Sequence, residues 1–483
     1  MNKSNINLVP DKVNPSPDYY CTWQTQLYAT SDGKPEVQRN IIGERALFNA
    51  ERPFGWAYFY EKARRDLILV MDDSWDVPLS GDNSYYGSLI LNKEKFPSVT
   101  IKELTEQIKS LGWKGLGGWV CAQESEKHSN SNSPTDYWEE RLKEAKESGL
   151  SYWKVDWGKR ARDNEFRKLL TELGKVLAPN LVIEHSIIKN SITYSQVFRT
   201  YDVPAIMSIP MTMEKLADVL SLQEGGLINC EDEAYIAAAG GFTMGIMRHP
   251  YIGALPDGRE DMSFPEIHRN LKSKMFEVIR AACWHRIAPA FELSGSYANV
   301  SDLQLSDTWE FLNKNEEIEE WWFNMTSIKD FLHRDILTKN APAIISRNTN
   351  LPKVLPDENE LVPFVVSSKN PNGAFSIATC GRTVGRKYII PKCNITVNIE
   401  KSDTIGIFGE YNNLILESTG VISQIFMQDL AGKSALDITS EVTVNQDQII
   451  IPGNLIHKIG TMEQPIEDTS EPGVVVNIKR PEA

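Results

Sequence analysis

The chain has 483 residues, with 51 basic and 65 acidic side chains and a formal net charge of −14 at pH 7. This length exceeds what a single hydrophobic core usually covers, so one large domain and one smaller domain are expected. An acidic balance of this size repels nucleic acid and anionic membrane surfaces, and it favours a soluble protein with neutral or cationic ligands. We therefore expect neither nucleic acid nor a membrane as a partner, while a homo-oligomer is compatible with these numbers.

The six cysteines are scattered, with no Cys-x-x-Cys pair and no histidine pair at metal-ligand spacing. We expect reduced, mostly buried thiols, although Cys380 and Cys393 could face each other across two strands. Residues 1–17 are polar and lack the apolar core of a signal peptide, and no apolar run is long enough for a bilayer. The chain as given is expected in the cytoplasm, but an exported protein with its leader removed would look the same.

Residues 18–346 alternate between short apolar runs and longer helical periodicities, which is typical of parallel βα units. Three of the helices have clear start signals. One follows a capping-box spacing at Thr100, one begins at Ser133 before a proline, and one has Asp163 as its N-cap. Each is followed by an apolar run that reads as a strand.

Eight apolar runs in this region are strand candidates. They are Tyr19–Trp23, Leu67–Met71, Lys114–Val120, Tyr152–Asp156, Leu181–His185, Val197–Thr200, Leu227–Cys230 and Pro289–Leu293. Eight strands in this length favour a closed (β/α)8 TIM barrel over an open sheet, whose edge strands would need protection. Acidic and aromatic residues gather just after these strands, where the active site of such a barrel is built. These residues are Trp23, Asp72, Asp73, Trp119, Asp156, His185, Asp202 and Asp232.

After residue 346 the helical periodicity stops and short β-branched runs take over, separated by turn signals such as Pro371-Asn372-Gly373. This pattern predicts a C-terminal antiparallel β-sandwich. The expected domains are therefore a catalytic barrel at 1–346 and a sandwich at 347–483. The sandwich carries no convergent acid, base or metal-ligand set, so no chemistry is assigned to it.

The strand that ends in Lys154-Val155-Asp156 carries the strongest chemical signal. Alternation along a strand points Lys154 and Asp156 to the same side, among the aromatic rings of neighbouring residues. A lysine stabilises an ionised carboxylate, and tryptophan faces suit the apolar faces of sugars, so Asp156 reads as a nucleophile in a carbohydrate-active site. The alternative is a strand-end salt bridge beside two core tryptophans.

A glycosidase needs a second carboxyl group to protonate the leaving oxygen. Asp202 is the best candidate because it follows a strand and precedes Val203-Pro204, which favours extended backbone. Arg199 could hold a sugar hydroxyl or pair with a neighbouring carboxylate. The adjacent Asp72 and Asp73 repel each other, and sugar hydroxyls could supply the hydrogen bonds that they need; a metal ion is the rival explanation.

Three motifs resemble those of the retaining α-galactosidase (melibiase) clan. Asp72-Asp73-Ser74-Trp75, Lys154-Val155-Asp156 and Arg199-Thr200-Tyr201-Asp202 are similar, in that order, to its Asp-Asp-Gly-Trp, Lys-x-Asp and Arg-x-x-Asp motifs. The resemblance implies that Asp156 is the nucleophile and Asp202 the acid/base. It also implies that Asp72, Asp73, Lys154 and Arg199 bind the sugar, and that no metal or organic cofactor is required.

Weaker likenesses extend further along the barrel. The strand end at Trp119 resembles an aromatic strand end of the raffinose-synthase and alkaline α-galactosidase branch, and Asn229-Cys230-Glu231-Asp232 resembles an Asn-Asp-x-Asp region. Asp232 is equally explained as an acidic residue at a helix N-terminus. Trp23 and Trp119 are candidate sugar platforms that would otherwise be core residues.

Departures from the clan pattern bear on the substrate. Ser74 replaces a glycine, and the Glu184-His185-Ser186 loop replaces one that contacts the sugar's 2-substituent. His185 could bond a sugar hydroxyl or serve as a structural partner. The predicted function is a retaining exo-glycoside hydrolase that acts on terminal α-galactosides or a related sugar by double displacement. The alternatives are a transglycosidase of the raffinose-synthase type and a barrel that binds glycans without cleaving them.

Overall fold

The computed structural model describes residues 6–28, 39–49, 55–129, 133–200, 203, 207–250, 269–310, 336–356, 361–445 and 447–481. Eight parallel strands close into a barrel in chain order, with β1 hydrogen-bonded to both β2 and β8. They are β1 (Tyr19–Cys21), β2 (Ile68–Met71), β3 (Gly115–Val120), β4 (Tyr152–Val155), β5 (Val182–His185), β6 (Val197–Arg199), β7 (Leu227–Glu231) and β8 (Thr243–Ile246). The predicted (β/α)8 barrel is confirmed.

Helices and short turns connect these strands and cover the barrel. The helices are α1 (Trp23–Tyr28), α3 (Glu44–Phe48), α4 (Ile101–Ser110), α5 (Pro134–Glu147), α6 (Asn164–Leu177), α7 (Ser208–Leu220), α8 (Ala234–Gly240) and α9 (Met275–Ile287). The 3₁₀ turns are η1 (Trp56–Tyr58), η2 (Arg64–Asp66), η3 (Asn83–Tyr85) and η4 (Lys189–Thr193). The predicted caps are present, including the reciprocal capping box of Thr100 and the Asp163 side chain at the start of α6.

The eighth strand differs from the sequence prediction. Pro289–Leu293 is irregular, and the barrel closes instead through β8, which follows α8 after Gly241. α8 has only seven residues, and Gly241 at φ 66° turns the chain directly from the helix towards the strand. A βα unit this short gives little helical periodicity, so the sequence pattern does not predict β8.

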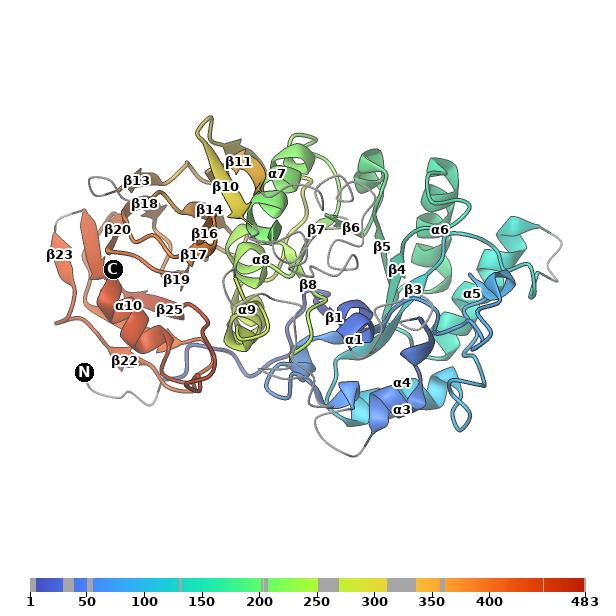
Figure 1. Ribbon diagram of the computed structural model, residues 1–483. Helices are drawn as coiled ribbons and strands as arrows, with labels where there is room; N and C mark the ends of the chain where they lie inside the picture. Colours follow the sequence, from blue (N-terminus) through green and yellow to red (C-terminus); the bar gives the residue numbers. More distant parts are fainter. Residues whose placement is uncertain are drawn as a thin grey trace.

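The C-terminal part forms two main sheets, and it lies on the left of Figure 1, with the barrel on the right. The first is an eight-stranded sheet in the order β22-β21-β25-β19-β15-β14-β12-β9, and the second a five-stranded sheet in the order β13-β18-β20-β24-β23. The strands of the first are β9 (Ala298–Val300), β12 (Ile344–Arg347), β14 (Phe364–Lys369), β15 (Phe375–Cys380), β19 (Thr404–Phe408), β21 (Gln424–Asp429), β22 (Leu436–Asp437) and β25 (Gly473–Lys479). Those of the second are β13 (Lys353–Leu355), β18 (Asn394–Glu400), β20 (Asn413–Ser418), β23 (Thr443–Asn445) and β24 (Gln448–Pro452).

The sandwich is mixed rather than fully antiparallel. Most neighbouring strands run antiparallel, but β12 and β14, β15 and β19, and β18 and β20 run parallel. The chain leaves β15 for the other sheet before it returns at β19, and a strand that returns after such a crossover can enter parallel. Smaller pairs are β10 (Gln304–Glu310) with β11 (Ile336–Pro342) and β16 (Arg382–Val384) with β17 (Lys387–Ile389), and α10 (Gly453–Gly460) precedes β25.

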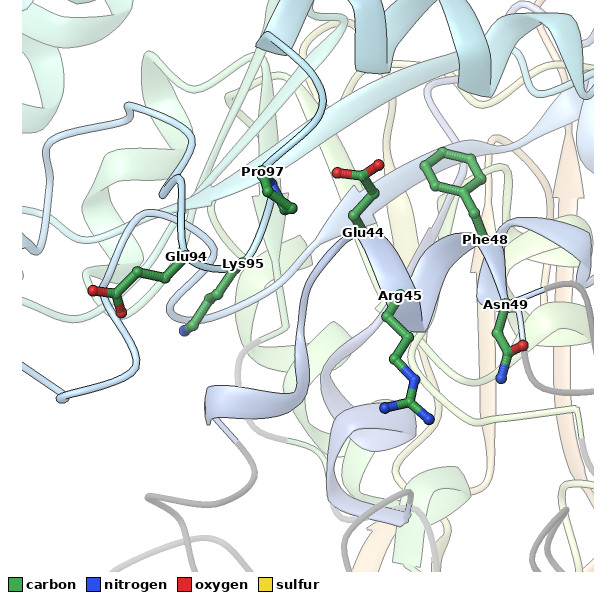
Figure 2. A pocket seen from close by; sticks show the side chains of 7 residues that line it. All are labelled: Glu44, Arg45, Phe48, Asn49, Glu94, Lys95 and Pro97. Carbon is green, nitrogen blue, oxygen red and sulfur yellow. The ribbon is translucent and has the colours of Figure 1, made fainter.

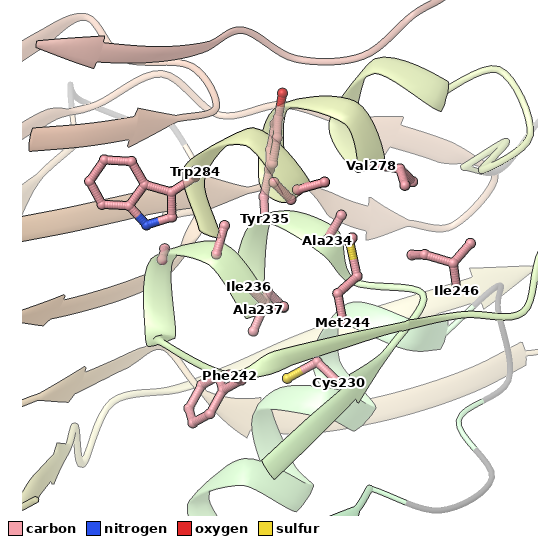
Figure 3. Packing of buried hydrophobic residues seen from close by; sticks show 14 of the residues in the cluster. Cys230, Ala234, Tyr235, Ile236, Ala237, Phe242, Met244, Ile246, Val278 and Trp284 are labelled. Atoms are coloured by element: carbon pink, nitrogen blue, oxygen red, sulfur yellow. The ribbon is translucent and has the colours of Figure 1, made fainter. Parts of the chain in front are cut away.

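Helices α8 and α9 lie between the barrel and the eight-stranded sheet (Figures 1 and 3). Trp284 of α9 packs on β19, where a side chain in place of Gly406 would meet the indole at 2.9 Å. Arg347 of β12 donates to the carbonyls of Gly240 and Gly241, which satisfies the end of α8. The division at residue 346 remains a prediction; β9, which precedes it, already pairs with β12.

All six cysteines are free and buried, as expected from their spacing. Cys380 and Cys393 therefore form no disulfide with each other. Within the described ranges, no helix is long and apolar enough to cross a membrane.

Candidate active site

Asp156 lies just after β4, at the carboxyl end of the barrel strands, and is held by two donors. The indole Nε1 of Trp119 donates to Oδ2 at 3.0 Å, and Arg199 Nη2 lies 3.2 Å from Oδ1. The Asp156 side chain is 10% exposed, whereas that of Arg199 is 1% exposed. A carboxylate fixed by a charged and a neutral donor, but still reachable, suits a nucleophile.

Lys154 points to the same side of β4 as Asp156, as alternation predicted, but its ion pair is with Asp72. Its Nζ lies 2.6 Å from Asp72 Oδ2, and the Cys21 thiol donates to the same oxygen at 2.8 Å. Burial by itself lowers the pKa of Lys154, but the Asp72 carboxylate and other anions outweigh it and raise that pKa above its ordinary value. Lys154 is thus a permanent cation beneath the Asp72 carboxylate.

Asp73 is buried and is bonded both by Arg39 and by the next residue of its own loop. Arg39 Nε lies 3.0 Å from Oδ2, and the Ser74 hydroxyl donates to Oδ1 at 2.7 Å. Burial raises the pKa of Asp73, while Arg39 and Ser74 act in the opposite direction. Ser74, the departure from the expected glycine, adopts a left-handed backbone at φ 73°, the conformation that glycine enters most readily.

Aromatic rings flank Asp156 on one side. The Trp119 and Trp157 centroids are 5.2 Å apart, and Tyr86 meets Trp157 edge-on at 5.0 Å. The Tyr86 hydroxyl is 2.9 Å from Ser74 Oγ, which connects these rings to the Asp73 loop. Trp119 is therefore next to the nucleophile candidate, as predicted, although it is almost fully buried.

Arg199 joins Asp156 to two further buried carboxylates that the sequence analysis did not select. Its Nε lies 3.1 Å from Glu184 Oε1, and its Nη1 lies 2.7 Å from Glu231 Oε1. Burial raises the pKa of Glu184 to about 7, against the opposing effect of Arg199. Glu184 is the register partner of Lys154 in the pairing of β4 with β5. Once the strand order is known, the same alternation that selects Lys154 also places Glu184 inside the barrel.

His185 lies on the other side of β5 from Glu184, facing α6. Its Nδ1 is 3.1 Å from Arg167 Nη1 and its Nε2 is 2.8 Å from Thr171 Oγ1. Burial and the Arg167 charge lower the pKa of His185 well below its usual range. The structure therefore places it in the layer between barrel and helices and does not bring it to Asp156.

Asp232 and Trp23 are separate from the contacts around Asp156. Asp232 Oδ1 accepts from the backbone amides of Met247 and Arg248, at 2.9 and 3.0 Å, and so fixes the chain after β8. Burial raises the pKa of Asp232 to about 6. Trp23 begins α1 and packs, partly buried, against the apolar cluster that includes Tyr19 and Met247.

Asp202 lies outside the described residues, but both flanks of its segment are anchored to β7. The amide and hydroxyl of Thr200 donate to the Asn229 carbonyl at 3.2 and 2.9 Å. The Val203 amide donates to Glu231 Oε2 at 2.9 Å. The role of Asp202 therefore remains a prediction from the sequence.

A cavity of about 490 Å³ lies between α3 and the segment before α4 (Figure 2). Its lining consists of Glu44, Arg45, Phe48, Asn49, Glu94, Lys95 and Pro97, none of which is a predicted site residue. Lys95 Nζ donates to the carbonyls of Ser74 and Arg39, so this cavity adjoins the Asp73 loop from outside. Among the described residues, no group of three or more His, Cys, Asp or Glu side chains could hold a metal ion.

No family model and no curated protein matches the chain. It is similar to the crystal structure of a GH27 β-L-arabinopyranosidase from Geobacillus stearothermophilus, with 10% identity, 97% of each chain covered and a TM-score of 0.41. A candidate α-galactosidase from Bacteroides fragilis gives 10% identity, 97% of this chain, 80% of that chain and a TM-score of 0.44.

An α-amylase from Geobacillus thermoleovorans gives 8% identity, 98% of this chain, 100% of that chain and a TM-score of 0.43. The likeness to the raffinose-synthase branch remains a prediction. At these identities, the chemistry has to be inferred from the residues of the site.

Proposed function

We propose that this protein is a retaining exo-glycoside hydrolase that acts on a terminal α-galactoside or a related sugar. Asp156 is the nucleophile and Asp202 the acid/base. The observation that carries the proposal is the setting of Asp156, which Trp119 and Arg199 hold at the carboxyl end of the barrel beside the Lys154–Asp72 pair. All of these residues except Trp119 belong to the three motifs that resemble the α-galactosidase clan.

In the first half of the reaction, Asp156 attacks the anomeric carbon while Asp202 protonates the departing oxygen. The Arg199 and Trp119 donors orient the Asp156 carboxylate for its attack on the sugar. In the second half, Asp202 removes a proton from water, which attacks the glycosyl-enzyme and releases a sugar of retained configuration. A retaining mechanism requires roughly 5–5.5 Å between the two carboxyl groups.

Asp72, Asp73 and Lys154 are the proposed ligands of the sugar hydroxyls. Each is buried and already bonded to a protein partner, so their orientation is set before substrate arrives. Preorganised polar groups of this kind favour a bound sugar because little ordering is left for the binding step. Galactose, N-acetylgalactosamine and β-L-arabinopyranose share the ring stereochemistry that these three side chains would recognise. They are the sugars to test.

The test is a panel of nitrophenyl glycosides of these three sugars, with release of nitrophenol followed by absorbance. Proton NMR of the first product formed reports whether the anomeric configuration is retained. Adding a sugar acceptor and separating the products distinguishes hydrolysis from glycosyl transfer. Turnover with inversion would contradict the roles of Asp156 and Asp202, and no turnover of any glycoside would favour a glycan-binding barrel.

A further inference from the structure

Glu231 stands at the last position of β7, pointing into the barrel, and the backbone after it is fixed. Asp232 has a left-handed conformation at φ 54°, its amide donates to the Gly245 carbonyl at 2.9 Å, and its side chain accepts from two amides after β8. Because the chain turns immediately after Glu231, the direction of its side chain is set by β7 and β8 together. Its carboxylate is 2% exposed.

The two oxygens of Glu231 serve different partners. Oε1 lies 2.7 Å from Arg199 Nη1, and Oε2 accepts from the Val203 amide at 2.9 Å. Through Arg199, Glu231 is one step from the Asp156 carboxylate. Through Val203, it holds the residue that follows Asp202 in the chain.

The other flank of that segment is also tied to β7, through the two bonds of Thr200 to the Asn229 carbonyl. β7 therefore fixes residues 200 and 203, on either side of residues 201 and 202. An ion pair with Arg199 alone would occupy one oxygen of Glu231 and leave the segment after Arg199 untouched. The second bond gives Glu231 a mechanical connection to that segment.

We infer that Glu231 is a positioning residue, which joins the cation beside the nucleophile to the chain segment that carries the acid/base. This inference rests on the function proposed above. A general acid contributes about 10²–10⁴-fold to a rate, and a misplacement of about 1 Å can forfeit much of that. Loss of Glu231 therefore impairs protonation of the leaving group more than attack on the sugar.

The dependence on leaving group separates these two steps. A dinitrophenyl glycoside needs little protonation to depart, whereas a methyl glycoside of the same sugar depends on the acid. The quantity to measure is kcat/KM, which includes the steps up to formation of the glycosyl-enzyme. It is measured for both substrates with the wild type and with Glu231→Ala. The expected ratio of kcat/KM for methyl over dinitrophenyl glycoside falls by about 10-fold or more.

Glu231→Gln serves as the second variant, because it keeps the side-chain volume but has one acceptor oxygen for two partners. It is expected to change the ratio in the same direction by a smaller factor. Glu184→Gln is the matched control, because Glu184 also meets Arg199, at 3.1 Å, while its other described bonds go to Tyr152 and Tyr19. Its kcat/KM can change, but the ratio should stay within about 2-fold of wild type.

Equal losses on both substrates in folded Glu231 variants, or a ratio that changes as much in Glu184→Gln, would overturn the inference. Folding is checked by thermal unfolding of each variant. Failure of the proposed function gives a different result, since wild type would then cleave neither glycoside of any sugar in the panel. The two failures are therefore distinguishable.

Discussion

The two ends of the barrel both contain buried ion pairs, but with different ratios of charge. At the amino end, Asp66 pairs with Arg286 at 3.0 Å, and Asp18 Oδ2 lies 2.6 Å from His285 Nδ1. At the carboxyl end, Arg199 meets three carboxylates. The Arg286 charge is paired with Asp66, whereas the Arg199 charge is shared among three carboxylates and neutralises each of them less.

This difference indicates a division of labour. The pairs at the amino end link α9 to the starts of β1 and β2, and their removal should affect stability. At the carboxyl end, the buried carboxylates of Glu184 and Glu231 lie around Arg199 beside Asp156, the proposed nucleophile. Substitutions at the two ends should therefore separate effects on activity from effects on stability.

The largest effect is expected for Asp156→Asn. An amide cannot act as the nucleophile, so kcat on an activated aryl glycoside should fall by on the order of 10⁴-fold or more. The free energy of unfolding should change by less than about 1 kcal/mol, because Arg199 keeps Glu184 and Glu231 as partners. Steady-state kinetics and urea unfolding measure both, and unchanged turnover would remove Asp156 from the mechanism.

Arg286→Met is expected to have the opposite profile. It leaves the fully buried Asp66 carboxylate without its cation, which should destabilise the fold by about 3 kcal/mol. The kcat of the folded protein should remain within about 2-fold of wild type, since Arg286 lies at the end of the barrel away from Asp156. A loss of kcat similar to that of Asp156→Asn would show that the two ends are not independent.

Sequence reasoning found the residues that one strand can specify. Alternation along β4 placed Lys154 and Asp156 on one side, and the structure agrees. Glu184 and Glu231 were missed because their importance depends on Arg199, which reaches them from a neighbouring strand. His185 was selected for its side-chain chemistry, although the position of Glu184 inside the barrel requires His185 to face α6.

Elements with weak local signals were harder to predict. β8 follows a helix of seven residues, and its location depends on closure of the barrel with β1 rather than on its own pattern. The parallel neighbours in the sandwich likewise depend on where the chain returns after a crossover. The position of β8 and the direction of these strands are set by tertiary packing, so local sequence patterns do not predict them.

Glu184→Gln tests the charge state within the carboxyl-end cluster. Burial raises the folded-state pKa of Glu184 to about 7, above its unfolded value, so the folded protein binds an extra proton between these values. The stability that this group contributes is therefore present at low pH and lost as pH rises towards 7. Relative to Glu184→Gln, the free energy of unfolding of wild type should fall by about 3 kcal/mol from about pH 4.5 to pH 7. Parallel pH curves for the two proteins would show that Glu184 titrates near its ordinary value.

His185→Gln should have the smallest effect on activity and marks the boundary of the carboxyl-end cluster. His185 bonds Thr171 and Arg167 on the α6 side of β5, so KM and kcat should both stay within about 2-fold of wild type. Glutamine can replace only part of this pairing, and the expected loss of stability is about 1 kcal/mol. Glu184→Gln, one residue earlier but facing Arg199, is the control that should alter kcat/KM. A ten-fold rise in KM for His185→Gln, with stability unchanged, would mean that His185 contacts the sugar and that the cluster extends beyond the barrel interior.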